Sequence, residues 1–201
     1  MSDSIAQFVA DLVAASIGAT VNPYRVHKPS LDRPGGAGQR AANLEAYLGD
    51  HPQPALMLVG EAPGYRGCRF SGIAFTSERS LPPEQRSSMR PEGWIEPSAT
   101  IIHGALAKAG LEADTVLWNA CPFHPAGASP LSNRTPTRSE LEAGLEWLTR
   151  LIALLHPGLV VAVGRSAQRS LPGAPVIRHP ANGGASACRA GIAAIAAQIR
   201  A

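Results

Sequence analysis

Three polar side chains stand just behind short apolar runs, where they are well placed to take part in chemistry. Glu61, Asn119 and His179 each lie within two residues of the end of such a run. A carboxylate can position a water molecule or stabilise positive charge, whereas an amide and an imidazole can donate hydrogen bonds to an atom that becomes negative. Together the three groups suit the hydrolysis of a bond that separates a cationic fragment from an anionic one.

The elements that must position these side chains alternate between strand and helix. Buried strands are predicted at 55–59, 115–118, 159–163 and 176–177. Helices are predicted at 5–15, 39–48, 98–108, 141–155, 166–171 and 186–200, and Thr137 with Glu140 forms a capping box before the fourth of them. This alternation predicts an α/β fold with three layers, α/β/α, around a four-stranded parallel sheet. Because ligands bind at the carboxyl ends of parallel strands, the three polar segments should converge on one rim.

The length and amino-acid composition predict one compact domain. The 201 residues are 45% hydrophobic and 16% charged, which suffices for a single domain over 1–201, with residues 1–50 as a helical extension packed on it. No apolar run approaches the ~18 residues of a membrane span, and the N-terminus lacks the features of a signal peptide. We therefore expect a cytoplasmic monomer without membrane contact.

The cysteines predict neither a metal site nor a disulfide framework. Cys68, Cys121 and Cys188 are 53 and 67 residues apart and form no C-x-x-C pair. We therefore expect no metal and no cofactor. The phosphate-binding patterns G-x-x-x-x-G-K-[ST] and G-x-G-x-x-G are also absent, which argues against a common nucleotide-binding site.

The basic residues are almost all arginine. Net charge is +3, and because only Lys28 and Lys108 are lysines, 16 of the 18 basic residues are arginines. The planar guanidinium suits phosphate groups and stacks on bases, which favours an anionic partner. The alternative is a solvated surface whose arginine content follows the base composition of the genome.

The polar segments 60–64, 119–125 and 178–184, in this order, resemble the active-site motifs of the uracil-DNA glycosylase superfamily. The first, Gly-Glu-Ala-Pro-Gly, is similar to that of the family-four enzymes, whereas 72–78 is closer to the phenylalanine-bearing loop of family five. The resemblance covers residues 55–184. It implies a glycosylase-like fold and a DNA glycosylase of base excision repair, which hydrolyses the N-glycosidic bond of a flipped-out damaged base, above all uracil.

The resemblance also implies roles for individual residues. Glu61 would position the attacking water and stabilise the cationic sugar, and His179 would donate a hydrogen bond to O2 of the departing base. The Asn119 amide can donate to O4 and accept from N3–H of uracil, a pattern that cytosine reverses. Phe75 would stack on the extruded base, or else pack in the core. Further base-binding residues would be Gly60, Ala62, Pro63, Gly64 and Tyr65.

Contacts to DNA phosphates are expected from loop residues near the motif rim. The candidates are Arg66, Arg69, Arg134, Arg138, Arg165 and Arg178, with Ser132, Asn133, Ser166 and Asn182 as neutral partners. The alternative is that most of these side chains are simply solvated.

We expect four further polar or aromatic side chains to have structural roles. Trp118 alternates with the residue that follows it and should point into the core. Glu78 should cap a helix or pair with Arg79, although a second carboxylate near the sugar is the alternative. His103 and His124 belong to no pattern and should lie in the core or on the surface.

The sequence departs from the best-known family in ways that affect specificity. Ala62 and Gly64 stand where that family has an aspartate that aids water attack and a tyrosine that excludes the thymine methyl group. Exclusion of the methyl group would then fall to Tyr65 or the Phe75 loop. The last motif continues without the leucine that wedges into a duplex, so we expect single-stranded or mispaired DNA to be preferred.

Two special chemistries of relatives are not expected. Three isolated cysteines cannot hold the four-cysteine iron-sulfur cluster of family four. Residues 64–91 contain no histidine, so the covalent capture shown by the crosslinking relatives is not expected either. Two alternatives stay open: a protein that binds uracil or single-stranded DNA without cleavage, and a glycosylase for hypoxanthine, xanthine or mismatched thymine.

Overall fold

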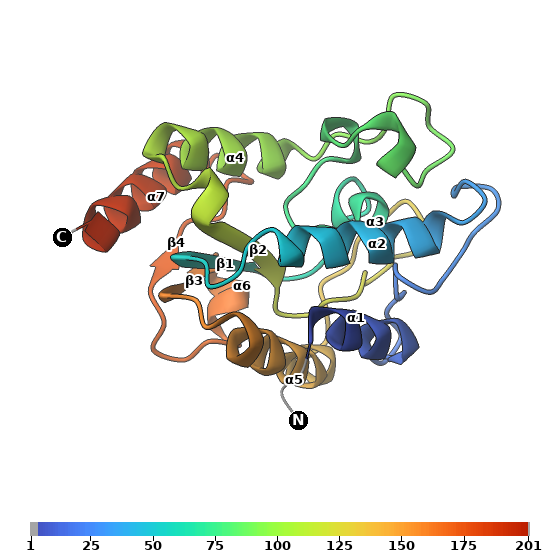
Figure 1. Cartoon of the computed structure of the whole chain (residues 1–201), viewed down its shortest axis with the longest axis horizontal. Helices are drawn as coiled ribbons and strands as arrows, with labels where there is room; N and C mark the ends of the chain where they lie inside the picture. Colours follow the sequence, from blue (N-terminus) through green and yellow to red (C-terminus); the bar gives the residue numbers. More distant parts are fainter. Residues whose placement is uncertain (1–3, 201) are drawn as a thin grey trace.

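The computed structural model describes residues 4–200 and contains a four-stranded sheet in which every strand is parallel to its neighbours (Figure 1). The strands are β1 (Leu56–Gly60), β2 (Thr115–Asn119), β3 (Leu159–Val163) and β4 (Val176–Ile177), in the order β2-β1-β3-β4. The predicted α/β class and parallel sheet are confirmed, and the predicted strand ends are correct to within one residue.

Helices cover both faces of the sheet. One face packs against α1 (Ile5–Ala14), α2 (Gly36–Gly49) and α5 (Arg138–Leu155), and the other against α4 (Pro97–Ala109) and α7 (Ala185–Arg200). Figure 1 shows α4 with α7 on one side of the strands and α1 with α5 on the other. The short helices are α3 (Cys68–Ser71), α6 (Arg165–Gln168) and the 3-10 turns η1 (Glu78–Ser80), η2 (Pro83–Gln85) and η3 (Glu112–Asp114).

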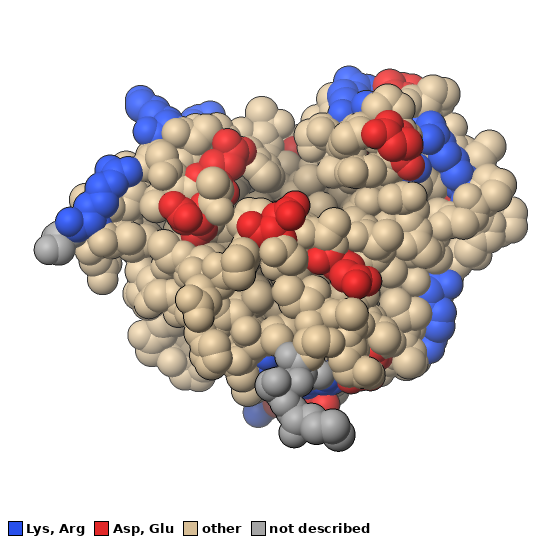
Figure 2. Space-filling model, viewed as in Figure 1, with Lys and Arg blue, Asp and Glu red and all other residues tan. Residues whose placement is uncertain are grey.

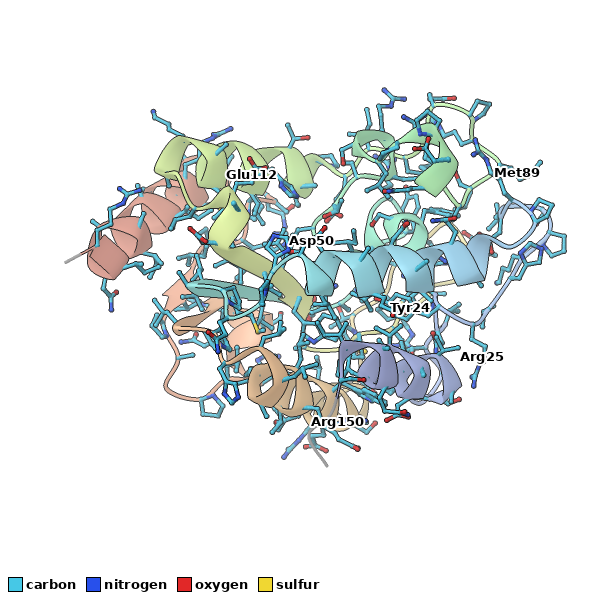
Figure 3. The ribbon with its side chains drawn as sticks, viewed as in Figure 1. Tyr24, Arg25, Asp50, Met89, Glu112 and Arg150 are labelled. Atoms are coloured by element: carbon cyan, nitrogen blue, oxygen red, sulfur yellow. The ribbon has the colours of Figure 1, made fainter. Side chains whose placement is uncertain are left out.

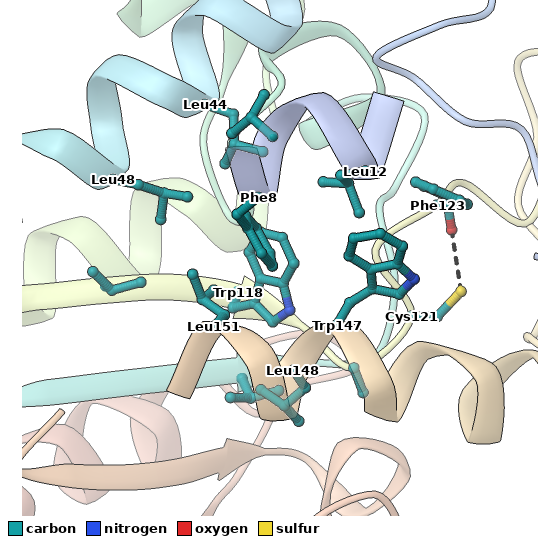
Figure 4. Close-up of a cluster of buried hydrophobic side chains, with 14 of the residues drawn as sticks. Phe8, Leu12, Leu44, Leu48, Trp118, Cys121, Phe123, Trp147, Leu148 and Leu151 are labelled. Atoms are coloured by element: carbon teal, nitrogen blue, oxygen red, sulfur yellow. Dashed lines mark hydrogen bonds between the residues drawn. The ribbon is translucent and has the colours of Figure 1, made fainter. Parts of the chain in front are cut away.

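Two apolar cores follow from the alternation of side chains along the strands. In β1, Met57 and Val59 join the cluster formed by α1, α2 and α5, whereas Leu56 and Leu58 join the cluster under α4 and α7. In the first cluster, the ring centroids of Phe8 of α1 and Trp118 of β2 lie 5.9 Å apart (Figure 4). Trp118 is 2% exposed, which confirms that it points into the core.

Helix α5 is fixed close to the end of β2. The Thr137 hydroxyl accepts from the Glu140 N–H at 3.2 Å and the Glu140 carboxylate accepts from the Thr137 N–H at 2.8 Å, so the predicted capping box is present. A Cβ on Gly144 would stand 3.0 Å from the Cα of Cys121 and closer still to the Ala120 carbonyl. This close approach brings the second turn of α5 beside the loop that follows β2.

The long segment 61–96 between β1 and α4 contains no strand and is ordered by buried polar groups. Asp32 is 1% exposed and forms ion pairs at 3.2 Å with both Arg40 and Arg69. Burial alone would raise the pKa of the Asp32 carboxyl, but its bonds to the two guanidinium groups outweigh that cost and lower it. Arg69 is 2% exposed, so its predicted contact with phosphate is wrong.

Glu78 orders the second half of the same segment. Its fully buried carboxylate accepts from the N–H groups of Ser87 and Ser88 at 2.7 and 2.6 Å and from the N–H of Trp94 at 3.2 Å. A structural role was predicted, but the partners are these backbone groups and the Ser88 hydroxyl, which donates at 2.6 Å, and not Arg79. Within residues 4–200, no helix combines the length and hydropathy that a membrane span requires.

Candidate functional site

A cleft of about 940 Å³ opens at the carboxyl ends of the four strands. The segments that follow all four strands line it, and the polar residues predicted after β1, β2 and β4 meet there. Of the predicted site residues, the lining includes Glu61, Ala62, Pro63, Gly64, Tyr65, Arg66, Phe75, Asn119, Arg165, Ser166, Arg178, His179 and Asn182. Gly60 and Arg134 are not among the lining residues.

Gly60 lies beneath the cleft and creates the space for two other side chains. A Cβ at this position would stand 2.6 Å from Cε2 of Phe75 and 2.8 Å from Oδ1 of Asn119. Phe75 is 5% exposed and has a φ of +48°, a left-handed conformation that is rare for an aromatic residue. The strained turn presses the ring against the end of β1, where it forms one wall of the cleft.

Asn119 is the last residue of β2 and pairs in register with Gly60 of β1. Its side chain is 5% exposed and points into the cleft. Among the residues that the structure describes, none hydrogen-bonds to this amide. A buried amide without internal partners has its donor and its acceptor available for a ligand.

His179 has a defined tautomer. Its Nδ1 accepts a hydrogen bond from the N–H of Ala181 at 3.1 Å, which places the ring proton on Nε2. Burial, assisted by the charge of Arg178, lowers the pKa of His179, so the ring is neutral at pH 7. The imidazole therefore offers an N–H donor on its far side, and its ring centroid lies 6.1 Å from that of Phe75.

Glu61 stands where two clefts meet. Its backbone carbonyl accepts from the N–H of Cys121 at 2.9 Å, which extends the pairing of β1 and β2 by one residue. The half-buried residue lines both the main cleft and a smaller one of about 470 Å³. The lining of the smaller cleft is largely apolar and includes Pro136, Leu141 and Leu145.

The loop that carries Glu61 is held by the segment that follows β2. His124 is 1% exposed, and its Nδ1 lies 2.8 Å from the carbonyl oxygen of Pro63. Burial lowers the pKa of His124, so the neutral ring donates this bond through its Nδ1–H. The Asn133 side chain accepts from the N–H of Tyr65 at 2.9 Å. His124, predicted to lie in the core or on the surface, is thus a core residue that fixes the first motif.

The arginines predicted to contact phosphate have different environments. Arg66, Arg165 and Arg178 lie on the rim of the main cleft. Arg134 instead pairs with Glu140 at 2.6 Å, and Arg138 pairs with Glu142 at 2.7 Å beside the smaller cleft.

The face shown in Figure 2 has a different charge pattern. Acidic side chains gather across its middle and left, and lysines and arginines lie toward its margins. Asp50 and Glu112 lie on this face (Figure 3). This face is therefore not a basic surface, whereas the cleft rim has three arginines.

Sequence reasoning missed several residues that line the cleft, among them Cys68, Glu96 and Ser98. Glu96 is the N-cap of α4, and Ser98 lies in its first turn. Neither follows a strand, so the rule that located the other site residues does not reach them. The one available signal was the Glu-Pro pair at the predicted helix start.

The cysteines and acidic residues form no obvious metal centre. Over residues 4–200, no group of three or more His, Cys, Asp or Glu side chains is arranged to hold a metal ion. The three cysteines are free and buried, and burial raises the pKa of Cys68 to about 12 and that of Cys121 to about 11.

Comparison with known proteins agrees with this geometry. A family model described as "Uracil DNA glycosylase superfamily" matches residues 47–197. The crystal structure of wild-type SMUG2 from Pedobacter heparinus is similar, with a TM-score of 0.68 and 15% sequence identity. The alignment covers 98% of this chain and 97% of that one, so the two share a fold over their full lengths. No match was found among curated proteins.

Proposed function

Since the chain belongs to the uracil DNA glycosylase superfamily, we propose that it is a DNA glycosylase that hydrolyses the N-glycosidic bond of a flipped-out damaged base, with uracil as the preferred base. The supporting observation is that Glu61, Asn119 and His179 converge on one cleft whose wall is the Phe75 ring. An anion-stabilising donor, a base-reading amide and a carboxylate are the groups that this reaction needs.

Glu61 acts on the sugar side of the bond. As the bond to the base breaks, positive charge develops on the deoxyribose, and a nearby carboxylate stabilises it. The same carboxylate orients the water molecule that adds to the sugar carbon. The base leaves with the electron pair of the broken bond, the water supplies the hydroxyl group on the sugar carbon, and the proton that the water releases passes to Glu61 and finally to the departed base.

His179 acts on the departing base. A donor that is already in place strengthens its hydrogen bond as the leaving group becomes anionic, and removing such a donor typically costs ~3 to 4 kcal/mol of barrier. The neutral tautomer with its proton on Nε2 has this donor ready without a change of protonation.

Asn119 reads the base and Phe75 supports it. The free amide of Asn119 complements O4 and N3–H of uracil, and the Phe75 ring offers a stacking face worth ~1 to 3 kcal/mol. Gly64 leaves the first motif open, because a Cβ there would meet only the Asn133 amide at 3.9 Å. This opening favours acceptance of larger bases, so hypoxanthine, xanthine and mismatched thymine are included as test substrates.

Single-stranded or mispaired DNA is the proposed substrate form. The loop after β4 places Ala181, Asn182 and Gly183 at an exposed tip, and none of them is a bulky apolar side chain. Extrusion of a base costs least from an unpaired or mispaired site, and a tip without a wedge contributes little to it.

The test is single-turnover cleavage of labelled single strands that contain one uracil, hypoxanthine, xanthine or thymine, followed by alkali to break abasic sites. Glu61→Gln and His179→Ala should each reduce cleavage about 100-fold or more. Glu45→Gln, on the exposed side of α2, is the matched control and should cleave at the wild-type rate.

Strand breaks at uracil that disappear in both variants would support the proposal. Uracil-dependent binding without cleavage of any base would replace it with a non-catalytic reader of damaged DNA. Preference for a base other than uracil would retain the enzyme class and change its substrate.

A further inference from the structure

A carboxyl group that the proposed reaction does not use lies in the same cleft as Glu61 and His179. Glu96 is the N-cap of α4, and its side chain lines the cleft together with Cys68 and Phe75. Its Oε2 lies against Gly67, is shut off from solvent and has no hydrogen-bond partner among residues 4–200, so Oε1 is the oxygen available to a ligand in the cleft. A buried carboxylate oxygen with no partner is costly, so its presence beside a ligand cleft requires an explanation.

The backbone opposite makes room for this carboxyl group. A Cβ on Gly67 would collide with the Glu96 carboxylate, so the glycine allows the carboxyl to lie directly against the chain. The backbone of Glu96 is held in place as well, because its N–H donates to the Ser77 hydroxyl at 2.9 Å. Both ends of the residue are therefore defined by residues of the segment 61–96.

In the described part of the chain, residues 4–200, no cation compensates the charge of Glu96. Cys68 is a neutral thiol with a pKa of about 12, and the Nε of Arg66 donates to the Tyr65 hydroxyl at 2.8 Å. Burial alone therefore raises the pKa of Glu96 to about 7. In the neutral form the carboxyl group is a hydrogen-bond donor, whereas in the ionised form it only accepts.

We propose that the protonated carboxyl group of Glu96 donates a hydrogen bond to a carbonyl oxygen of the flipped-out base, and that its ionisation weakens the site. This inference rests on the proposed glycosylase function. Ionised Glu96 would lose the donor and place a negative charge beside a base that is itself becoming negative. The site would then have a third base-contacting donor in addition to Asn119 and His179, and one that depends on pH.

Other titratable and charged groups face the same cleft. On the loops packed around Glu96 they are Tyr65, Arg66 and Cys68, and across the cleft they are Glu61, Arg165, Arg178 and His179. On its own helix, the His103 ring bonds to the Phe75 carbonyl and to Glu112. A pH profile of the wild-type chain alone would mix their effects. Comparison with an isosteric variant at position 96 removes their common contribution.

The experiment measures single-turnover cleavage of a single-stranded uracil oligonucleotide between pH 6 and pH 8.5. Glu96→Gln keeps the shape and a donor at every pH, so it should match the wild type at pH 6 and exceed it about tenfold at pH 8.5. Glu96→Ala should be about tenfold slower than the wild type at pH 6. Glu84→Gln, exposed in η2, is the control and should follow the wild-type profile throughout.

Three results would overturn the inference. Identical pH profiles for the wild type and Glu96→Gln would show that no proton-dependent donor acts at position 96, and would leave the proposed glycosylase function standing. A wild-type rate for Glu96→Ala at pH 6 would show that the carboxyl group contacts nothing on the base. Absence of cleavage by the wild type under all conditions would overturn the proposed function and this inference together.

Discussion

At the scale of single residues, the cleft depends on two glycines, which leave space that a larger residue would fill. Gly60 leaves room for the Phe75 ring and the Asn119 amide, and Gly164, with a φ of +89°, allows the His179 Cβ to approach within 3.1 Å of where its own Cβ would be. Each position lies next to a polar group of the proposed reaction. A methyl group at either glycine would therefore displace a reacting side chain before it disturbed the core.

Gly60→Ala should separate activity from stability. The added methyl group would overlap the Phe75 ring and the Asn119 amide so closely that they must shift by about 1 Å, and a misplacement of about 1 Å can cost about 100-fold in rate. The free energy of unfolding should fall by only ~1 to 3 kcal/mol, the usual cost of overpacking. The measurement pairs single-turnover cleavage with urea unfolding.

Gly38→Ala provides the control for that experiment. Gly38 lies within α2 with nothing inside 4 Å of its potential Cβ. Alanine there should stabilise the protein by ~0.5 to 1 kcal/mol and leave the rate unchanged. A wild-type cleavage rate for Gly60→Ala would contradict the assignment of Phe75 and Asn119 to the site.

The sequence predicted the residues whose position depends on a strand. Glu61, Asn119 and His179 were found because parallel strands end at one edge, and the structure places all three in the cleft. Glu96 and His124 were missed as site components because their partners, Gly67 and Pro63, are brought to them by tertiary contacts that no local pattern encodes. The same limit explains why buried Arg69 was predicted to face DNA.

At the scale of elements, the start of α5 joins three parts of the chain through one carboxylate. Glu140 is 3% exposed and accepts from Arg134 at 2.6 Å, from the Thr137 N–H at 2.8 Å and from the Ala19 N–H at 3.2 Å. The bond to Arg134 is the main cause that lowers the pKa of Glu140 to about 2. The start of α5 is therefore stabilised by the ionised carboxylate of Glu140.

Glu140→Gln should lower the free energy of unfolding at pH 7 by about 2 kcal/mol. Because the folded pKa of about 2 lies below the unfolded value of 4.5, the contribution is complete above pH 4.5 and disappears as the pH falls toward 2. Urea unfolding of both proteins at several pH values measures this convergence. Glu142→Gln, in the exposed pair with Arg138, is the control and should change the free energy of unfolding by less than about 0.5 kcal/mol. A difference between the wild type and Glu140→Gln that stays constant down to pH 2 would show that the ionisation of Glu140 does not stabilise the fold.

The tip of the loop after β4 predicts how strand pairing affects the rate. Since Ala181 is exposed and offers only a methyl group, uracil in a single strand should be cleaved about tenfold faster than uracil paired with adenine. Ala181→Leu adds a wedge and should raise the rate on the duplex more than on the single strand. Equal rates on both substrates for the wild-type chain would contradict the prediction.

The elements themselves were largely predictable, with one exception. The strands and the long helices follow from periodicity and caps, and their ends agree with the structure to within three residues. Residues 61–96 were predicted only as motif and loop, and α3, η1 and η2 were missed. Their conformation comes from buried bonds to Asp32 and Glu78, and charged residues at such positions have no periodic signature.

At the scale of the whole molecule, the sheet and the segment 61–96 are stabilised by different forces. The sheet lies between two apolar cores, to which the part of the segment after Phe75 contributes no side chain; the buried cluster of Asp32, Arg40 and Arg69 holds the segment as well. Burial, assisted by the charge of Arg69, lowers the pKa of Arg40 to about 10, and the carboxylates of Asp32 and Glu78 act in the opposite direction. Tyr24 closes the same region by donating from its hydroxyl to the Gly72 carbonyl at 3.0 Å.

Asp32→Ala should therefore destabilise the protein by ~3 to 5 kcal/mol, because it leaves two buried guanidinium groups without a counterion. Urea unfolding measures the loss. Asp50→Ala, on the exposed surface at the end of α2, should cost less than about 0.5 kcal/mol. A cost for Asp32→Ala as small as that of the control would show that the cluster does not stabilise the segment.

The difference between the apolar sheet and the polar segment also determines which property the protein loses first on heating. Residues 76–96 contribute no side chain to either apolar core, and regions with few apolar contacts open locally at a lower free energy than the core strands and helices do. Phe75 and Glu96 lie on the segment 61–96, but most of the helical content lies outside it. On mild warming, ellipticity should therefore persist after cleavage has stopped, and a spectroscopic melting curve will overstate the temperature range in which the protein can repair anything.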